Sequence, residues 1–253
     1  MHLPDYSNNP NVQAQIRWFQ HHPHSLIEMT KKAQPYIYYI HQQTLKNNLP
    51  SELALLAFIE SSYNPFAQSS VASGMWQFTY GTAKRMGLRI NPWYDGRRDI
   101  QASTRAALNY LNYLHKNAKG DWVVAVASYN AGPGAIRKAL RRANYHYDSP
   151  WDLRLPSETK LYIAKFLAIV TIIKDPQHYG MKLPPIANQP YLAEITVHSQ
   201  INLRHAARIA KIDSKLMHVL NAGFSQSVTE PHHKAKLLLP IRHAEALSES
   251  LAA

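Results

Sequence analysis

The chain has 253 residues and no cysteine. This excludes disulfide bonds, thiolate metal sites and a cysteine nucleophile. It also has no continuous apolar run of about 18 residues, the length that a transmembrane helix needs. No basic segment followed by an apolar one stands at the start, so we expect any signal or anchoring segment to lie outside this sequence.

Acidic residues are scarce. The sequence holds 28 Lys and Arg against 16 Asp and Glu, which gives a formal net charge of +12. Residues 1–190 carry 21 of these basic residues and 11 of the acidic ones, so most of the excess lies there. Such a balance favours an anionic partner, namely nucleic acid, an anionic membrane or an acidic polymer. No recognised nucleic-acid-binding module is present, so we do not expect nucleic acid as a partner.

Most of the first 175 residues show helical spacing of apolar residues. The expected helices span residues 11–48, 51–60, 101–117, 121–131, 135–143 and 157–173. Ser51 is the expected N-cap of the second of these, and residues 62–82, rich in Ser, Gly and Thr, are expected to form a loop. The Pro-rich segment 183–190 marks a domain boundary. We therefore expect a mainly α protein whose catalytic domain spans residues 1–185, with a helical extension at about 1–48.

The pattern changes after that boundary. Strands are expected at residues 194–198 and 236–240, with helices at 203–210 and 214–220 between them. This predicts a small β-α-α-β module over residues 191–243, followed by a tail at 244–253. No second copy of the pattern is present, so a repeat array is excluded.

Carboxylates are rare where chemistry would need them. Between residues 50 and 130 there are five, and four have ordinary explanations: Glu52 lies in a first helical turn, Asp95 in a turn signature, and Asp99 and Asp121 precede helices as caps. Glu60 instead ends the apolar run of residues 53–59 and begins a polar loop. Burial there would raise its pKa and let it donate a proton near neutral pH. A solvated helix end is the alternative that this segment alone leaves open.

Four motifs follow one another along the chain. They are Glu60-Ser61, Gly74-Met75-Trp76-Gln77, Tyr129-Asn130-Ala131-Gly132 and Glu158-Thr159-Lys160-Leu161-Tyr162. In this order they resemble the lysozyme-like lytic transglycosylases of bacterial cell walls, over roughly residues 12–180. The resemblance implies a lysozyme-like helical fold with Glu60 as the catalytic acid.

The same resemblance assigns five substrate-binding residues. Ser69 would contact a sugar acetamido group, although an ordinary loop hydroxyl is the alternative. Gln77 would hydrogen-bond the glycan, and Tyr129 would lie beside Glu60. Asn130 would support that turn and contact sugar. Tyr162 would line the site, unless it is a core tyrosine at helical spacing.

The implied reaction is cleavage of the β-1,4 bond between N-acetylmuramic acid and N-acetylglucosamine. Glycosidases normally use two carboxylates, whereas the loop and cleft motifs supply only Glu60. As the resemblance implies, Glu60 would act first as acid and then as base, and the C6 hydroxyl of the muramic acid would attack its own C1 to form a 1,6-anhydro sugar. No cofactor or metal is expected. A goose-type muramidase, which hydrolyses the bond, and a catalytically silent peptidoglycan-binding protein are the alternatives.

The resemblance also bears on partner and location. It implies peptidoglycan glycan strands as the partner and the periplasm or cell envelope as the location. We expect a monomer, with any membrane tether outside this chain.

Residues 191–243 resemble a LysM module, a β-α-α-β fold that binds N-acetylglucosamine chains. The usual Gly-Asp-Thr after the first strand is replaced by Ser199-Gln200-Ile201-Asn202. That loop carries much of the sugar contact in LysM modules, so we expect a degenerate module that braces the catalytic domain.

Six basic residues have two interpretations. They either attract an acidic polymer, such as the carboxylate-bearing stem peptides of peptidoglycan, or simply form solvated faces: Arg97, Arg98, Arg137, Lys138, Arg141 and Arg142.

Overall fold

The computed structural model describes residues 2–252, which form mainly helices. The chain divides into two compact units that do not follow chain order. The first unit comprises Met1–Lys31, Thr44–Ile59 and Ala107–Pro185, and the second comprises Lys32–Gln43, Glu60–Ala106 and Ile186–Ala253. Four helices continue from one unit into the other: α2 (Pro23–Ala33), α3 (Ile37–Lys46), α4 (Leu56–Ser61) and α6 (Ile100–Asn117).

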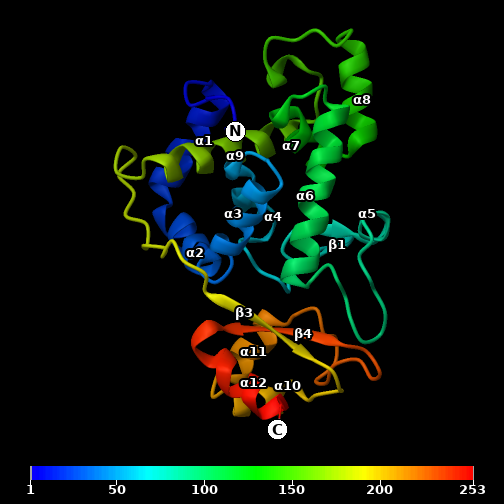
Figure 1. The fold of residues 1–253 in the computed structure, drawn as a ribbon. Coiled ribbons are helices and arrows are strands. Elements are labelled where there is room, and N and C mark those ends of the chain that lie inside the picture. The colour runs from blue at the N-terminus through cyan, green and yellow to red at the C-terminus, as the bar shows by residue number, and fades with distance from the viewer. Residues whose placement is uncertain (1, 253) are drawn as a thin grey trace. The chain divides into compact units, whose positions relative to one another are not determined.

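The first unit is built around a buried helix. α7 (Trp122–Ala131) is buried from Trp122 to Ser128, and it packs against α8 (Pro133–Arg142) and α9 (Ser157–Lys174). α9 also packs against α1 (Pro10–His21), so the beginning and end of this unit lie side by side (Figure 1). The remaining elements are α2 (Pro23–Ala33), most of which belongs here, and the short 3-10 turn η2 (Pro150–Asp152).

The approach to Glu60 corrects one prediction. Residues 51–55 form a 3-10 turn, η1 (Ser51–Leu55), and the α-helix α4 begins only at Leu56. Pro50 occupies the cap position with φ −53°, and Ser51 is already inside the turn. Because proline fixes φ near this value, the turn starts one residue earlier than expected. The expectation that Ser51 caps the helix was therefore wrong; its hydroxyl donates instead to Glu52 Oε2 at 3.4 Å.

The second unit contains a short hairpin in a segment that was expected to be loop. β1 (Ala72–Ser73) pairs antiparallel with β2 (Phe78–Thr79), with Ala72 opposite Thr79 and Ser73 opposite Phe78. α5 (Tyr80–Arg85) follows directly and is capped by the Thr79 hydroxyl, which accepts from Thr82 N. Two-residue strands are too short to leave an alternating pattern in the sequence.

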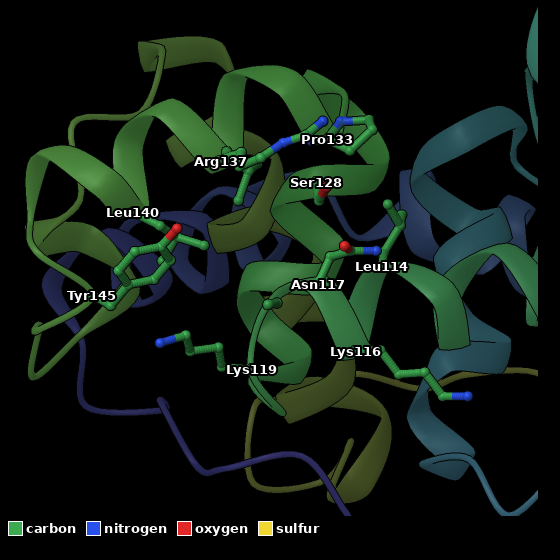
Figure 2. Close-up of a pocket in the computed structure, with 11 residues that line it drawn as sticks. Leu114, Lys116, Asn117, Lys119, Ser128, Pro133, Arg137, Leu140 and Tyr145 are labelled. Carbon is green, nitrogen blue, oxygen red and sulfur yellow. The ribbon is translucent and has the colours of Figure 1, made fainter.

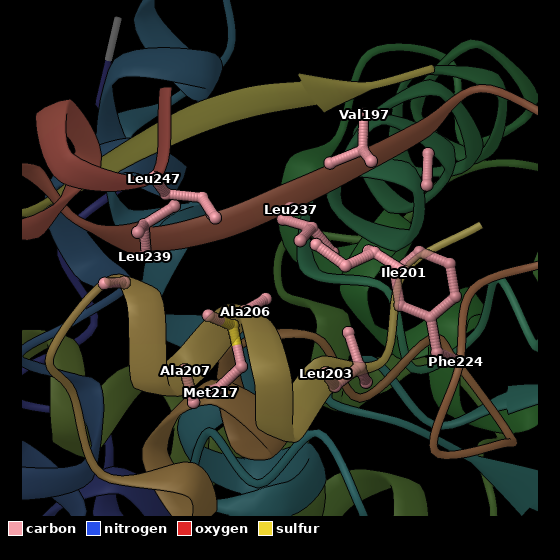
Figure 3. Packing of buried hydrophobic residues seen from close by; sticks show 12 residues of the cluster. Val197, Ile201, Leu203, Ala206, Ala207, Met217, Phe224, Leu237, Leu239 and Leu247 are labelled. Atoms are coloured by element: carbon pink, nitrogen blue, oxygen red, sulfur yellow. The ribbon is translucent and has the colours of Figure 1, made fainter. Parts of the chain in front are cut away.

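The C-terminal module (residues 191–252) has the expected β-α-α-β order with one helix added. β3 (Leu192–Val197) and β4 (Ala235–Pro240) pair antiparallel around α10 (Leu203–Ile209) and α11 (Ser214–Leu220). Residues 244–253 were expected to be a tail, but the 3-10 turn η3 (Ile241–His243) leads into α12 (Ala244–Ala252). Figure 3 shows Leu247 of α12 beside Leu239 of β4. Burial of the Leu247 side chain in this core stabilises α12.

The C-terminal module docks on residues 89–99 of the same unit. Asp95 N donates to Gly223 O at 2.8 Å, and Ser225 N donates to Trp93 O at 2.9 Å. The Tyr94 ring joins the module's apolar core and meets Phe224 with ring centroids 5.7 Å apart. These are backbone and core contacts, so segment 89–99 folds as part of the module.

Polar residues strengthen this docking. Glu230 forms an ion pair with Arg89 and accepts from Asn91 Nδ2 at 3.0 Å.

Within residues 2–252, no helix combines the length and apolar character needed to cross a membrane.

Candidate functional site

Glu60 lies near the end of α4, where the buried residues Leu56, Ala57 and Phe58 give way to a polar loop. Its side chain is half-buried. The next residue anchors the loop, because the Ser61 hydroxyl donates to Met75 O at 2.7 Å and accepts from Asn64 N at 3.1 Å. The expected raised pKa of Glu60 stays a prediction.

The loop after Glu60 turns sharply. Ser62 and Tyr63 have φ of 53° and 59°, a left-handed conformation that costs energy for any residue with a side chain. Tyr63 is fully buried, and burial raises the pKa of its hydroxyl well above the ordinary value. Burial of this ring secures the turn that carries the chain away from Glu60.

The motif loop (residues 61–79) is closed by Gly74 and Gln77. Gly74 N donates to Ala67 O at 2.8 Å, and Gln77 Nε2 donates to Ala67 O at 3.2 Å and to Gly74 O at 2.9 Å. Among the described residues, none donates to Gln77 Oε1. Gln77 therefore holds the loop with its nitrogen and leaves an oxygen for a sugar hydroxyl.

Gly74 is a position where only glycine fits. Its φ is +86°, and a Cβ placed on it would lie 1.8 Å from the carbonyl oxygen of Arg97. The motif loop thus rests on the backbone of segment 89–99, which the C-terminal module holds.

Ser69 is exposed and closes a turn of the motif loop. Its hydroxyl accepts from Ala72 N at 2.9 Å, and its backbone N donates to Ala72 O at 2.9 Å. The hydroxyl therefore has a structural task, which leaves its hydrogen free for a weak contact with Ala72 O at 3.4 Å or for a ligand. Contact with an acetamido group stays a prediction.

The other three expected site residues belong to the first unit. Tyr129 lies near the end of α7, with its ring 5.6 Å from the Tyr110 ring of α6. Asn130 follows, and its Oδ1 accepts from the hydroxyl of buried Thr159 at 2.8 Å. Tyr162 lies three residues beyond Thr159 on α9 and is half-buried. The structure therefore groups Tyr129, Asn130 and Tyr162 in one unit, and Glu60, Ser69 and Gln77 in the other.

Two residues were not assigned roles from the sequence, and a third, Arg98, was expected to attract an acidic polymer or to form a solvated face. Thr159 orients the Asn130 amide, and Tyr110 packs on Tyr129. Arg98 donates to Ser73 Oγ and to Gln68 Oε1, both at 3.2 Å, and so ties segment 89–99 to the motif loop. Thr159 could have been found from its place in the fourth motif; the other two rest on long-range contacts that no local pattern marks.

Asp95 and Asp99, the two other acids in residues 60–106, both have structural tasks. Asp95 accepts from Arg97 Nη2 at 2.7 Å and from Arg97 N at 3.0 Å. Burial alone would raise the pKa of Asp95, but the hydrogen bonds and charge of Arg97 outweigh it and lower that pKa. Asp99 accepts from Ala102 N at 2.6 Å and so caps the first turn of α6, as expected.

Glu52 is a buried carboxylate of the first unit with a structural role. It pairs with Lys174 at 3.2 Å and with His2 at 3.1 Å. Burial would raise its pKa, but a backbone hydrogen bond, Lys174 and His2 together lower it. Its place in the first turn of η1 was expected, whereas these two long-range partners were not.

Comparison with known proteins identifies the family. Residues 38–151 match the Transglycosylase SLT domain, and residues 191–253 match the Lytic transglycosylase MltD, LysM-like domain. This chain belongs to the SLT-type lytic transglycosylases. The resemblance of the four motifs to that family is therefore confirmed, as are the mainly α fold and the LysM-like character of the C-terminal module.

Two relatives illustrate the match. Membrane-bound lytic murein transglycosylase D of Escherichia coli (strain K12) is 36% identical over 247 residues, which cover 96% of this chain and 55% of that protein. The putative tributyltin chloride resistance protein of Alteromonas sp. (strain M-1) is 41% identical over 192 residues, covering 75% of this chain and 87% of that protein. The chain thus spans about half the length of the Escherichia coli relative.

Proposed function

We propose that this chain is a peptidoglycan lytic transglycosylase. It cleaves the β-1,4 bond between N-acetylmuramic acid and N-acetylglucosamine and leaves a 1,6-anhydro-N-acetylmuramic acid end. Membership of the SLT family and the names of the relatives support the reaction class and the murein substrate.

Glu60 performs both proton transfers in this proposal. It protonates the glycosidic oxygen as the C1–O bond breaks, and the carboxylate so formed then takes the proton of the muramic C6 hydroxyl as that oxygen bonds to C1. The proton count balances without water, because the sugar supplies both the nucleophile and the proton that restores Glu60. A single carboxylate suffices because no water is activated and no enzyme nucleophile is used.

The state of the other acids is the observation that carries this single-acid proposal. Asp95 is held by Arg97 and Asp99 caps α6, so both of the other carboxylates of residues 60–106 have structural tasks. A goose-type muramidase would need a second carboxylate to activate water. Asp95 suits that task poorly, because its pKa is lowered and its oxygens already accept from Arg97.

Five residues would position the sugar. Gln77 would accept a hydrogen bond from a sugar hydroxyl through its Oε1, and Ser69 would contact an acetamido group. Tyr129, Asn130 and Tyr162 would complete the glycan contacts, with the Asn130 amide nitrogen turned to the substrate because Thr159 occupies its oxygen.

A murein digest with wild type and Glu60→Gln tests the proposal. Wild type should release fragments with anhydro ends, and Glu60→Gln should slow release by about 10²–10⁴-fold, the usual contribution of a general acid or base. Mass spectrometry of the fragments distinguishes the candidate functions. Reducing muramic ends from wild type would establish the hydrolase instead, and no turnover by either protein would leave the silent binding protein.

Location and assembly follow the same family argument. We place the reaction on glycan strands in the periplasm or cell envelope, carried out by a monomer, with any membrane tether outside residues 1–253. Light scattering of the purified chain tests the monomer: a mass of twice 28.8 kDa would contradict it.

A further inference from the structure

Two stretches of the first unit form a basic surface without internal compensation. Residues 114–120 and 132–147 contain no Asp or Glu. All six of their Lys and Arg side chains are exposed, and none forms an ion pair within residues 2–252: Lys116, Lys119, Arg137, Lys138, Arg141 and Arg142. Uncompensated like charges repel one another, so such a cluster gains from an anionic partner.

Two basic residues of the second unit behave differently. Arg97 is bonded to Asp95, and Arg98 is bonded to Ser73 and Gln68, so both serve the fold. Arg137, Lys138, Arg141 and Arg142 of α8 have no such bonds within residues 2–252.

This surface surrounds a pocket of about 270 Å³ between α6, α7 and α8 (Figure 2). Leu114, Ile136 and Leu140 supply apolar walls, while Lys119 and Arg137 supply charge. Lys119 Nζ lies 4.0 Å from the centroid of the Tyr145 ring. In Figure 2 the Lys116 side chain turns away from the other labelled residues, so Lys119 and Arg137 are the cations that matter.

A hydroxyl that bonds to no described residue lines the pocket. Ser128 of α7 is 3% exposed, and among the described residues none accepts from or donates to its Oγ. Because this oxygen keeps some solvent-accessible surface, it opens on the pocket, where a ligand can hydrogen-bond to it. Asn117 adds an acceptor, because its Nδ2 already donates to Tyr113 O at 2.8 Å and leaves Oδ1 open.

A second hollow continues from the first along α8. Its lining includes Arg137, which both hollows share, together with Lys138, Arg141 and Arg142. Cations therefore extend outward from the pocket, as an elongated ligand with several separated negative charges requires.

We propose that this pocket binds the carboxylate-bearing stem peptide of peptidoglycan. The lactyl carboxyl group of muramic acid is consumed in its bond to the peptide, so the negative charges of such murein lie on the peptide. A peptide also brings N–H donors for Asn117 Oδ1 and Ser128 Oγ and short apolar side chains for the walls. A flat anionic membrane would meet the exposed cations but would not reach the recessed hydroxyl of Ser128, a residue only 3% exposed. The inference rests on the murein substrate proposed above.

Binding of a soluble murein tetrapeptide (L-Ala, γ-D-Glu, meso-diaminopimelate, D-Ala) to the whole chain tests the inference by calorimetry. The double variant Lys119→Gln/Arg137→Gln should bind it about tenfold more weakly, as expected when two partly screened charge contacts are lost. Ser128→Ala should weaken binding about threefold, as expected when one hydrogen bond is lost. The same peptide with its carboxylates amidated should bind wild type as weakly as the acidic peptide binds the double variant.

Arg17→Gln/Lys46→Gln is the matched control, because it removes two cations of the same unit that are exposed, have no ion pair within residues 2–252 and line neither hollow. Equally weakened peptide binding in this control would overturn the inference, because the net positive charge of the chain would then explain the binding. Unchanged peptide affinity in the Lys119/Arg137 double variant would also overturn it. If that variant then lost binding to phosphatidylglycerol vesicles, the surface would be assigned to a membrane.

The murein digest is run in parallel and tests the proposed reaction separately. A wild type that binds the peptide but releases no anhydro ends would refute the proposed reaction and leave the inferred peptide site unaffected.

Discussion

The motif loop and the C-terminal module belong to one compact unit but use their polar side chains differently. In the motif loop Gln77 keeps its Oε1 open, and Ser69 presents an exposed hydroxyl. In the C-terminal module the corresponding groups serve the fold. Asn202 caps α10, and Gln200 Nε2 donates to Thr229 O at 2.9 Å. The proposed sugar contacts of the motif loop rely on this contrast, because the polar groups named here in the C-terminal module are already used by its own structure.

The two regions are also linked. The C-terminal module holds segment 89–99 through Gly223 and Ser225, and that segment supports Gly74 of the motif loop through the Arg97 carbonyl. This supports the expectation that the degenerate module braces the catalytic part. Single substitutions can test whether the C-terminal module supports the motif loop and whether the two regions differ in sugar binding.

Gly74→Ala should have the largest effect on stability. The new Cβ would lie 1.8 Å from Arg97 O, a backbone atom that cannot swing aside, and the φ of +86° is itself strained for alanine. We expect the free energy of unfolding to fall by about 3 kcal/mol or more, the sum of overpacking and backbone strain. Urea unfolding measures this.

Gly81→Ala is the control for that experiment. It lies in α5, its φ is not positive, and a Cβ added to it would have nothing within 4 Å. It should stabilise the chain by up to about 1 kcal/mol, because alanine favours helix over glycine. A Gly74→Ala protein as stable as Gly81→Ala would contradict the close packing of the motif loop on segment 89–99.

Asn221→Ala should have the next largest effect. This buried side chain donates to Met217 O and Leu238 O at 2.9 and 2.8 Å and accepts from Leu238 N at 2.8 Å. Truncation leaves backbone groups of β4 unsatisfied, so we expect a loss of about 2–3 kcal/mol in urea unfolding. The exposed Asn112→Ala should change stability by less than about 0.5 kcal/mol. If Asn221→Ala instead weakened binding to chito-oligosaccharides without loss of stability, the module would be a sugar-binding one.

The sequence predicted the parts whose signals are local. The long helices α6, α7 and α9 carry clear apolar patterns, and Asp121 caps α7 as expected by accepting from Val123 N and Val124 N. The four motifs led to the family. The order of strands and helices in the C-terminal module was also visible.

What the sequence did not predict depends on contacts between distant residues. β1 and β2 have two residues each, too few for a period, and α12 offers Leu247 as its fully buried anchor. The docking of segment 89–99 uses backbone bonds such as Asp95 N to Gly223 O, and backbone groups are the same in every sequence. The pairing of Asn130 with Thr159 needed α7 and α9 to be packed first.

Asp95→Asn should give a smaller, pH-dependent effect. Burial opposes the charge of Asp95, but Arg97 outweighs it and lowers the pKa below the ordinary 3.8. The unfolded chain therefore binds this proton more readily than the folded one, so the stabilisation is full above about pH 4–5 and is lost as pH falls through the lowered folded value. We expect Asp95→Asn to cost about 1–2 kcal/mol at pH 7 and less at pH 3.

Thermal unfolding at both pH values measures this difference. Glu249→Gln removes one exposed carboxylate of α12 and controls for net charge. An Asp95→Asn deficit of the same size at pH 3 and pH 7 would mean that the Arg97 pair does not brace segment 89–99 electrostatically.

Ser69→Ala should have the smallest effect on stability and the most informative effect on substrate. The turn loses the bond from Ala72 N to the hydroxyl but keeps the backbone bond from Ser69 N to Ala72 O, so we expect a loss of about 0.5–1 kcal/mol in an exposed turn. If the hydroxyl also touches an acetamido group, KM on soluble glycan strands should rise several-fold while kcat changes little, since binding of ground state and transition state would weaken alike. Ser69→Thr, which retains the hydroxyl, should restore KM. A Ser69→Ala protein with lower stability and wild-type KM would show that this hydroxyl serves only the fold, like the side chains of Asn202 and Gln200 in the C-terminal module.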